Sequence, residues 1–230
     1  VVTIKPNIIT GIIFIIGMIW LINLYNFMDG IDGLAGTETL FVSGGVALII
    51  FLGAGYANIV LQPDESINHS IILLLLILLV AIFGFLIWNW PPAKIFMGDV
   101  GSSYLGFIFG ALLIYSSQTS ILSIWTWLIL LGIFIVDATI TLIQRFISGA
   151  QWYSAHRSHA YQNAARQWGS HRKVTLSILA INIVWLFPLA WLATILPEWG
   201  VVFTTFAYLP LFALTIYLKA GKVPISDEQS

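Results

Sequence analysis

The sequence contains no cysteine and very little charge. Without cysteine the chain forms neither disulfides nor thiolate metal sites. Only 8% of its 230 residues are charged, and a formal net charge of −1 gives no reason to expect a nucleic-acid partner. Apolar residues dominate instead, at 59% of the chain, with a mean hydropathy of +0.96. This composition is typical of an integral membrane protein.

Long apolar runs predict an all-α fold, a polytopic transmembrane helix bundle. A helix needs about 20 apolar residues to cross the hydrocarbon core. In lipid, only helices and closed barrels satisfy all backbone hydrogen bonds. The runs here are too long for barrel strands, so helices are expected. We expect a single membrane-embedded domain over residues 1–230. Seven spans are predicted at about 8–26, 38–57, 68–88, 101–118, 120–143, 173–196 and 199–218.

Positive charge is concentrated on one side of this arrangement. The connections after the first, third and fifth spans share a side with the C-terminus. That side holds Lys94, Arg145, Arg157, Arg166, Arg172, Lys173, Lys219 and Lys222. The other side holds only Lys5. The positive-inside rule therefore predicts that the first side, including the C-terminus, is cytoplasmic.

Three polar clusters lie on this side. They are NLYNFMDGIDG at 23–33, NWPPAKIFMGDVGSS at 89–103 and a basic stretch at 145–173. Active-site loops are accordingly expected at about 23–37, 89–103 and 144–173. A transport pathway would place ionisable groups near the bilayer midplane. Groups gathered at the membrane surface favour chemistry between a soluble substrate and a lipid one.

The first cluster contains Asn23, Asn26, Asp29 and Asp32 within ten residues. Its Asp-Gly pairs are typical of turns between helices, and a simple turn accounts for the glycines. Carboxylate and amide oxygens are also the ligands that Mg²⁺ prefers, usually one or two carboxylates together with substrate phosphates. The residues favour a metal–phosphate site over a turn alone.

The second cluster carries Asp99 where an apolar helix is predicted to begin. A capping role for Asp99, Ser102 or Ser103 is the simple interpretation. A helix N-terminus also binds phosphate through its free N–H groups, and an adjacent aspartate can hold the metal that the phosphate binds. Phe96 is either a membrane anchor or a surface on which a base stacks.

The third cluster is basic and includes His156, Arg157 and His159. A short amphipathic helix lying on the membrane is one interpretation. Zinc would need a third ligand, for which the sequence offers no obvious candidate. A cationic clamp for a diphosphate accounts better for the arginine and histidine donors.

Asp137 stands outside these clusters, within a predicted span. An intramembrane carboxylate is a candidate functional residue. We slightly prefer a structural pairing of Asp137 with Arg145.

In their order between helices, NLYNFMDGIDGLAG, NWPPAKIFMGDVGSSYLG and AHRSHAYQ resemble motifs of the polyprenyl-phosphate N-acetylhexosamine-1-phosphate transferases, enzymes of the glycosyltransferase family 4 type. The resemblance covers essentially the whole chain. It implies transfer of a sugar 1-phosphate from a UDP-N-acetylated sugar to undecaprenyl phosphate, with release of UMP. It also implies Mg²⁺, or Mn²⁺ in its place, and a multi-pass protein of the bacterial cytoplasmic membrane with its active site on the cytoplasmic face.

Roles for individual residues follow from this resemblance only. Catalytic positions match Asp99, Asp29 and His159, and the metal site matches Asp99 and Asn26. The uridine-binding positions match Asp32, Asn89 and Phe96. The positions that hold the diphosphate and sugar match Asn23, His156, Arg157 and His159. The partners implied are the sugar nucleotide, undecaprenyl phosphate and membrane lipid, with a homodimer left open and no nucleic acid.

The chain departs from the family pattern in two places. The family carries paired aspartates before the first motif, and their absence here, with a first residue other than Met, predicts N-terminal truncation. Many members have His-x-His-His in the third cluster, where His159 matches the first His but Tyr161 and Gln162 occupy the other positions. This variant resembles the O-antigen-initiating branch, which uses UDP-FucNAc, UDP-QuiNAc or UDP-GlcNAc, and argues against the peptidoglycan enzyme. The alternatives are a catalytically incomplete fragment that binds UDP-sugar, and a membrane transporter or lipid-binding module.

Overall fold

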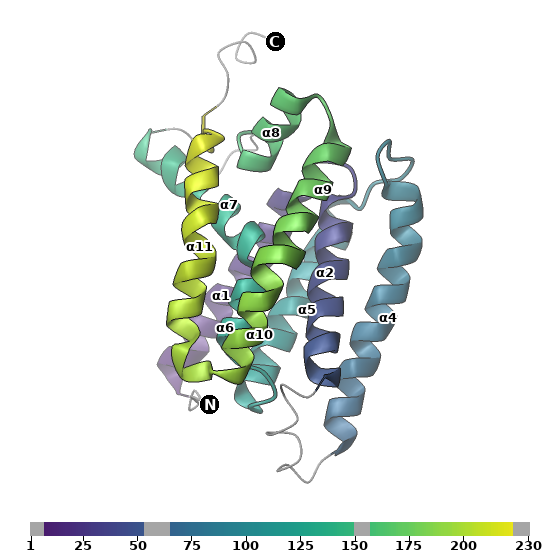
Figure 1. Ribbon diagram of the computed structural model, residues 1–230, viewed down its shortest axis with the longest axis vertical. Coiled ribbons are helices and arrows are strands. Elements are labelled where there is room, and N and C mark those ends of the chain that lie inside the picture. The colour runs from purple at the N-terminus through teal and green to yellow at the C-terminus, as the bar shows by residue number, and fades with distance from the viewer. Residues whose placement is uncertain (1–6, 53–64, 150–156, 223–230) are drawn as a thin grey trace.

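A computed structural model describes residues 7–52, 65–149 and 157–222, and these residues form helices and turns without a strand (Figure 1). This confirms the predicted all-α class. The elements are α1 (Ile8–Met28), α2 (Leu34–Phe51), α4 (Glu65–Asn89), α5 (Gly98–Gln118), α6 (Ile124–Leu130), α7 (Gly132–Ile147), α8 (Ala160–Trp168), α9 (His171–Ile181), the π-helix η1 (Asn182–Leu186), α10 (Phe187–Ile195), the 3₁₀ turn η2 (Pro197–Trp199) and α11 (Gly200–Tyr217).

The bundle has the dimensions of a polytopic membrane protein. Within the described residues, six helical segments are long and apolar enough to cross a membrane, and a bent pair makes up to seven. α9, η1 and α10 together form one of these segments, His171–Ile195. In Figure 1 the long helices run side by side, with the start of α1 and the end of α11 at opposite ends of the bundle.

One predicted span is wrong in shape. The run expected as a single helix over 120–143 is two helices, α6 and α7, which meet at Leu131 with a bend of 73°. In a straight helix the Leu128 carbonyl would accept a hydrogen bond from the backbone N–H four residues later in the chain. Here it accepts a hydrogen bond of 2.7 Å from the Tyr208 hydroxyl. The bend is therefore compatible with a low-dielectric surrounding, because α11 supplies the missing donor.

The connections are shorter than the sequence predicts. α2 begins at Leu34 rather than near 38, and α5 begins at Gly98 rather than near 101. The expected loop over 23–37 is thus reduced to residues 29–33, and the expected loop over 89–103 to residues 90–97. Most of the polar residues of these motifs therefore lie on helix ends, which hold side chains more firmly than a long loop does.

Close packing of α1 on α5 sets the geometry of the site. A Cβ added at Gly106 would lie 2.7 Å from the Ile22 Cα, and one added at Gly110 would meet the Met18 sulfur. These two glycines, four residues apart on α5, therefore let the two backbones approach closely. Tyr25 on α1 also packs its ring on Phe109 of α5, with centroids 5.5 Å apart.

Candidate active site

The connection between α1 and α2 is tight. Asp29 ends α1, and its N–H donates to the Asn26 carbonyl. Gly33 has φ of 76°, a left-handed conformation that glycine adopts without a Cβ clash. Its N–H donates to the Asn89 side-chain oxygen at 2.9 Å. The predicted turn is therefore present, and it is tied to the end of α4.

Asn26 and Asp99 bring the first two motifs together. The Asn26 amide donates to the Asp99 carboxylate at 2.9 Å and lies 3.3 Å from the Ser102 hydroxyl. Asp99 is in the first turn of α5 and exposed, while Ser102 bonds back to carbonyls of its own helix. Asp99 thus presents a carboxylate at a helix N-terminus, where negative charge is favoured.

Asp29 completes an acidic pair. Burial, and after it the nearby charge of Asp99, raise the pKa of the Asp29 carboxyl from its usual value near 3.8 to about 6, against the lowering effect of a hydrogen bond from the Gly98 backbone. Because the charges of Asp29 and Asp99 repel each other, a cation beside the two carboxylates is electrostatically favoured.

The donor set fits Mg²⁺ in the mode that relies on substrate. Among the described residues no group of three or more His, Cys, Asp or Glu side chains forms a complete metal cage. Mg²⁺ does not need one, because it usually takes one or two carboxylates and fills its octahedron with phosphate oxygens and water. Asp99, Asp29 and the Asn26 amide oxygen are the residues that would hold it.

Asp32 also lies in the connection between α1 and α2, where it contacts the start of α9. Its carboxylate accepts from the Ala93 N–H at 3.1 Å and lies 3.4 Å from His171 Nδ1. Its backbone carbonyl accepts from the Thr175 hydroxyl at 3.1 Å. Asp32 is therefore held by the 90–97 connection and by α9 together.

The other two residues expected to bind uridine differ in their surroundings. Asn89 is buried, and its amide is used internally, accepting from Gly33 and donating to the Ile95 carbonyl at 2.8 Å. Phe96 is 77% exposed, so its ring is free to meet a planar ligand or a lipid. Asn89 thus shapes the 90–97 connection that carries Phe96, and its direct contact with a base stays a prediction.

α8 docks on the end of α1. The Tyr161 hydroxyl donates to the Phe27 carbonyl at 2.9 Å, and the His159 ring stacks on Phe27 with centroids 6.0 Å apart. Burial raises the pKa of Tyr161 well above its ordinary value, so the hydroxyl stays a donor. The third motif is therefore brought against the first, as the clustering of all three on one side predicts.

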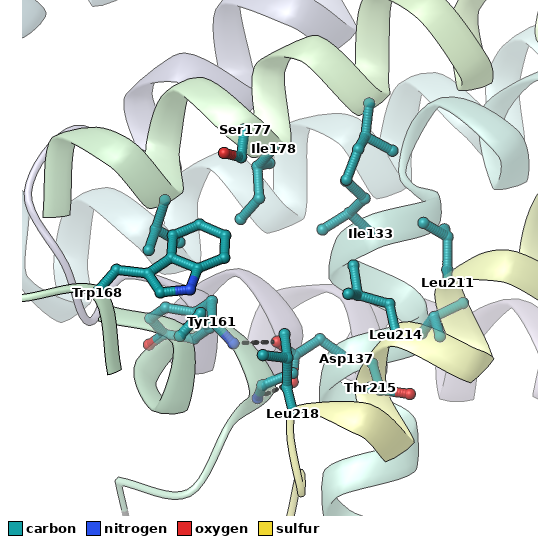
Figure 2. Close-up of a pocket in the computed structure, with 15 residues that line it drawn as sticks. Ile133, Asp137, Tyr161, Trp168, Ser177, Ile178, Leu211, Leu214, Thr215 and Leu218 are labelled. Carbon is teal, nitrogen blue, oxygen red and sulfur yellow. Dashed lines mark hydrogen bonds between the residues drawn. The ribbon is translucent and has the colours of Figure 1, made fainter. Parts of the chain in front are cut away.

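Asp137 holds the start of α8, which corrects the expected pairing with Arg145. Its carboxylate accepts from the backbone N–H groups of Ala160 at 2.9 Å and Tyr161 at 3.0 Å (Figure 2). It also lies 3.3 Å from His159 Nδ1. A carboxylate at a helix N-terminus satisfies donors that have no partner within the helix. Asp137 occupies that N-terminus, so α8 does not offer it to a phosphate.

α8 also packs on protein rather than only lying on the membrane surface. Tyr161, Asn163 and Ala164 are buried. The Asn163 amide donates to the carbonyls of Leu218 at 2.8 Å and Lys219 at 2.9 Å, which terminates α11. A short helix is therefore present where the third cluster allowed one, and its buried face contacts α1, α7 and α11.

The cavity behind Asp137 and Tyr161 has a different character from the site. It measures about 140 Å³ and is lined mainly by aliphatic side chains of α7, α9 and α11, among them Ile133, Ile178 and Leu211 (Figure 2). Its exposed lining is almost wholly apolar and offers few hydrogen-bonding partners to a polar ligand. It is therefore unsuited to a sugar nucleotide, which the polar groups near α1 and α5 can satisfy.

The remaining predicted site residues differ in their exposure. Asn23 is exposed, and its amide donates to the Ile19 carbonyl of its own helix at 2.7 Å. Arg157 is exposed, and its carbonyl accepts from Arg166 at 2.8 Å. His159 is only 1% exposed, so its contact with a diphosphate stays a prediction. His156 lies outside the described residues.

The fold and the site define a class of protein: a membrane-embedded helical bundle with an acidic, amide-lined site at one end. The chain belongs to glycosyl transferase family 4, whose family model matches residues 1–117. That range contains both acidic motifs and the helices that join them.

Curated relatives agree with this family. The chain is 32% identical over 173 residues to a Bacillus subtilis (strain 168) protein described as a probable undecaprenyl-phosphate N-acetylglucosaminyl 1-phosphate transferase, over 73% of this chain and 44% of the relative. It is 37% identical over 125 residues to a phospho-N-acetylmuramoyl-pentapeptide-transferase of Borreliella burgdorferi (strain ZS7), over 53% of this chain and 34% of the relative. The chain thus spans less than half the length of these two proteins.

Sequence reasoning missed several residues that organise the site. His171 and Thr175 contact Asp32, and Tyr161 anchors α8 to Phe27. His171 was visible only as one cation of a basic stretch. Asp137 carried a signal, as a lone carboxylate in an apolar run, but the sequence did not reveal which segment it holds.

Proposed function

We propose that the chain transfers an N-acetylhexosamine 1-phosphate from a UDP-sugar to undecaprenyl phosphate in the bacterial cytoplasmic membrane. The observation that carries the proposal is the contact of Asn26 with Asp99, beside Asp29, at one end of an apolar bundle. The family and the names of the two relatives support transfer of a phospho-sugar to a polyprenyl phosphate. The third motif's departure from His-x-His-His supports a FucNAc, QuiNAc or GlcNAc donor and the O-antigen role.

The reaction makes one P–O bond and breaks one. An oxygen of the lipid phosphate attacks the phosphorus that carries the sugar, and the bond from that phosphorus to the bridging oxygen breaks. UMP leaves with the electron pair. Such transfers depend more on positioning and charge neutralisation than on covalent help from the protein. Mg²⁺ bound between Asp99 and Asp29 would neutralise charge on the diphosphate.

The chain's own residues orient the reactants. The Asn26 amide donates a hydrogen bond to the Asp99 carboxylate and so fixes the orientation of that carboxylate. Asp32, held by Ala93 and Thr175, faces the uridine in this proposal, with Phe96 as the stacking surface. Arg157 lies exposed at the start of the third motif, where a guanidinium can bind phosphate oxygens in a fork.

UMP release tests the proposal. The chain, and a version extended upstream in its reading frame, would each be incubated with undecaprenyl phosphate, Mg²⁺ and one of UDP-GlcNAc, UDP-FucNAc or UDP-QuiNAc. We expect lipid-linked sugar and UMP in equal amounts with one of these donors. No product from either version with any donor contradicts the transferase proposal, and activity of the extended version alone identifies an incomplete fragment.

Asp99→Asn is the sharpest single variant. It keeps the shape of the side chain but removes its charge, and we expect UMP release to fall by about a hundredfold or more, because electrostatic stabilisation contributes most in such sites. Glu198→Gln removes an exposed acid in η2, the turn between α10 and α11, and serves as the matched control, with unchanged activity expected. Near-normal turnover of Asp99→Asn in the membrane would contradict the metal assignment.

A further inference from the structure

Glu38 is a buried carboxyl inside a membrane-spanning helix. It lies one turn into α2, is only 1% exposed, and accepts a hydrogen bond from the Asn182 amide at 2.6 Å. An ionisable side chain at such a depth is costly and therefore marks a functional requirement rather than a packing preference. Neither the acidic motifs nor the proposed reaction uses Glu38 directly.

Asn182 belongs to the face of α9 that touches Asp32. His171 and Thr175, four residues apart, contact the Asp32 carboxylate and carbonyl. Asn182 follows Thr175 by seven residues, which is two helical turns further along the same face. One face of the helical segment thus contacts the 29–33 connection near its N-terminal end and α2 about two turns further along.

The backbone is irregular where this stripe ends. Asn182 opens the π-helix η1, and its carbonyl accepts from the Phe187 N–H five residues on. Pro188 follows directly and has no N–H to donate to the turn before it. Single turns of π-helix occur frequently at functional sites. This turn gives Asn182 the position from which its amide reaches Glu38.

We propose that Glu38 and Asn182 are a positioning pair that sets the orientation of Asp32 and thereby the affinity for the nucleotide of the donor. This inference rests on the proposed function, in which Asp32 faces the uridine. The pair fixes α2 against α9 below the site, and His171 and Thr175 then fix Asp32 at the level of the site. The donor's nucleotide is bound between elements that this buried hydrogen bond holds in register.

The pair leaves the acidic centre untouched. Asn26 on α1 donates hydrogen bonds to Asp99 and Ser102 on α5, and neither bond involves a residue of α9. A displacement of α9 by about 1 Å would therefore weaken nucleotide binding more than the transfer step, because misplaced orienting groups act on the ligand they touch. A split between KM and kcat distinguishes positioning from general loss of structure.

Kinetics of four variants test the proposal: Glu38→Ala, Asn182→Ala, the double variant and Glu38→Gln. Each single alanine variant is expected to raise KM for the UDP-sugar about tenfold, with KM for undecaprenyl phosphate and kcat changed by less than about threefold. The double variant is expected to resemble the single ones, since both remove one interaction. Glu38→Gln keeps an oxygen for the Asn182 amide and is expected to behave as the unaltered chain.

Thr126→Val is the matched control. Thr126 is buried and makes a hydrogen bond of 2.8 Å to Thr194, between α6 and α10, away from Asp32. It is expected to leave both KM values unchanged. If the unaltered chain releases no UMP, the proposed function fails, whatever these variants do. If it is active and Glu38→Ala leaves the donor KM unchanged, or raises both KM values to a similar extent, the positioning role is overturned.

Discussion

At the scale of single residues, Asp29 stabilises the fold less than a neutral side chain would. Its carboxyl has a pKa of about 6 in the folded chain because of burial and the nearby Asp99, against 3.8 ordinarily. The folded state therefore holds the proton more tightly than the unfolded state does. The ionised acid destabilises the fold fully above pH 6, and the effect vanishes as pH falls below 4.

Asp29→Asn should therefore raise the thermal stability of the metal-free protein at pH 8. After discounting for partial exposure we expect about 1 kcal/mol, or about 2–4 °C in Tm. The gain should shrink toward zero at pH 4. Thermal unfolding of the detergent-solubilised chain in EDTA, followed by tryptophan fluorescence at both pH values, measures this. A lower Tm for Asp29→Asn at pH 8 would show that the carboxylate stabilises the fold.

Gly30 is needed because Tyr161 lies against it. A Cβ at this position would overlap the Tyr161 hydroxyl and come within 2.8 Å of Gln162 Nε2. Gly30→Ala should displace the hydroxyl from the Phe27 carbonyl and loosen α8, and we expect UMP release to fall about tenfold or more. Adding Tyr161→Phe removes the clashing atom, so the double variant should recover part of the activity. Loss without any recovery would mean that the clash does not involve this hydroxyl.

At the scale of elements, the contact of α1 with α5 holds the acidic centre. Gly106→Val would place its first carbon 2.7 Å from the Ile22 Cα, which is backbone and cannot rotate away. The helices should separate, lengthening the bond from Asn26 to Asp99, and activity should fall while the protein still inserts. Gly84→Val is the control, because the space around Gly84 in α4 is open. Equal losses in both variants would indicate a general effect of valine in these helices.

The sequence predicted the long helices well because lipid leaves the backbone few options. The last two spans were expected at 173–196 and 199–218 and are observed at His171–Ile195 and Pro197–Tyr217. The bend at Leu131 was missed because the apolar run continues through it without a break. The contact at the bend is tertiary, since the Tyr208 hydroxyl of α11 donates a hydrogen bond to the Leu128 carbonyl. A local pattern cannot show a partner 80 residues away.

For the site, as for the helices, the sequence predicted local features but not the contacts between distant segments. Residues from polar motifs on one membrane face, such as Asn26 and Asp99, were expected to meet, and they do. The residues that orient them come from distant helices, as with Asn182 and Glu38, 144 residues apart. Their pairing depends on which helix faces become neighbours, and the apolar stretches around them are too similar to specify that.

At the scale of the whole molecule, the proposed reaction requires the acidic end of the bundle to face the cytoplasm, where UDP-sugars are made. The distribution of lysine and arginine predicts this orientation. Arg172, at the start of α9, and Glu198, between α10 and α11, are exposed at opposite ends of one span. Because the chain has no cysteine, a single introduced thiol reports its own position.

Labelling of Arg172→Cys and Glu198→Cys with a membrane-impermeant maleimide tests the orientation. In intact bacterial cells with a permeabilised outer membrane, we expect Glu198→Cys to react and Arg172→Cys to react only after lysis. Retained UMP release in both variants shows that the labelled protein is folded, and neither side chain is given a role in the proposed transfer step. The reverse labelling pattern would place Asp99 and Asp29 outside the cell, away from the UDP-sugar, and the transferase proposal would fall together with the orientation.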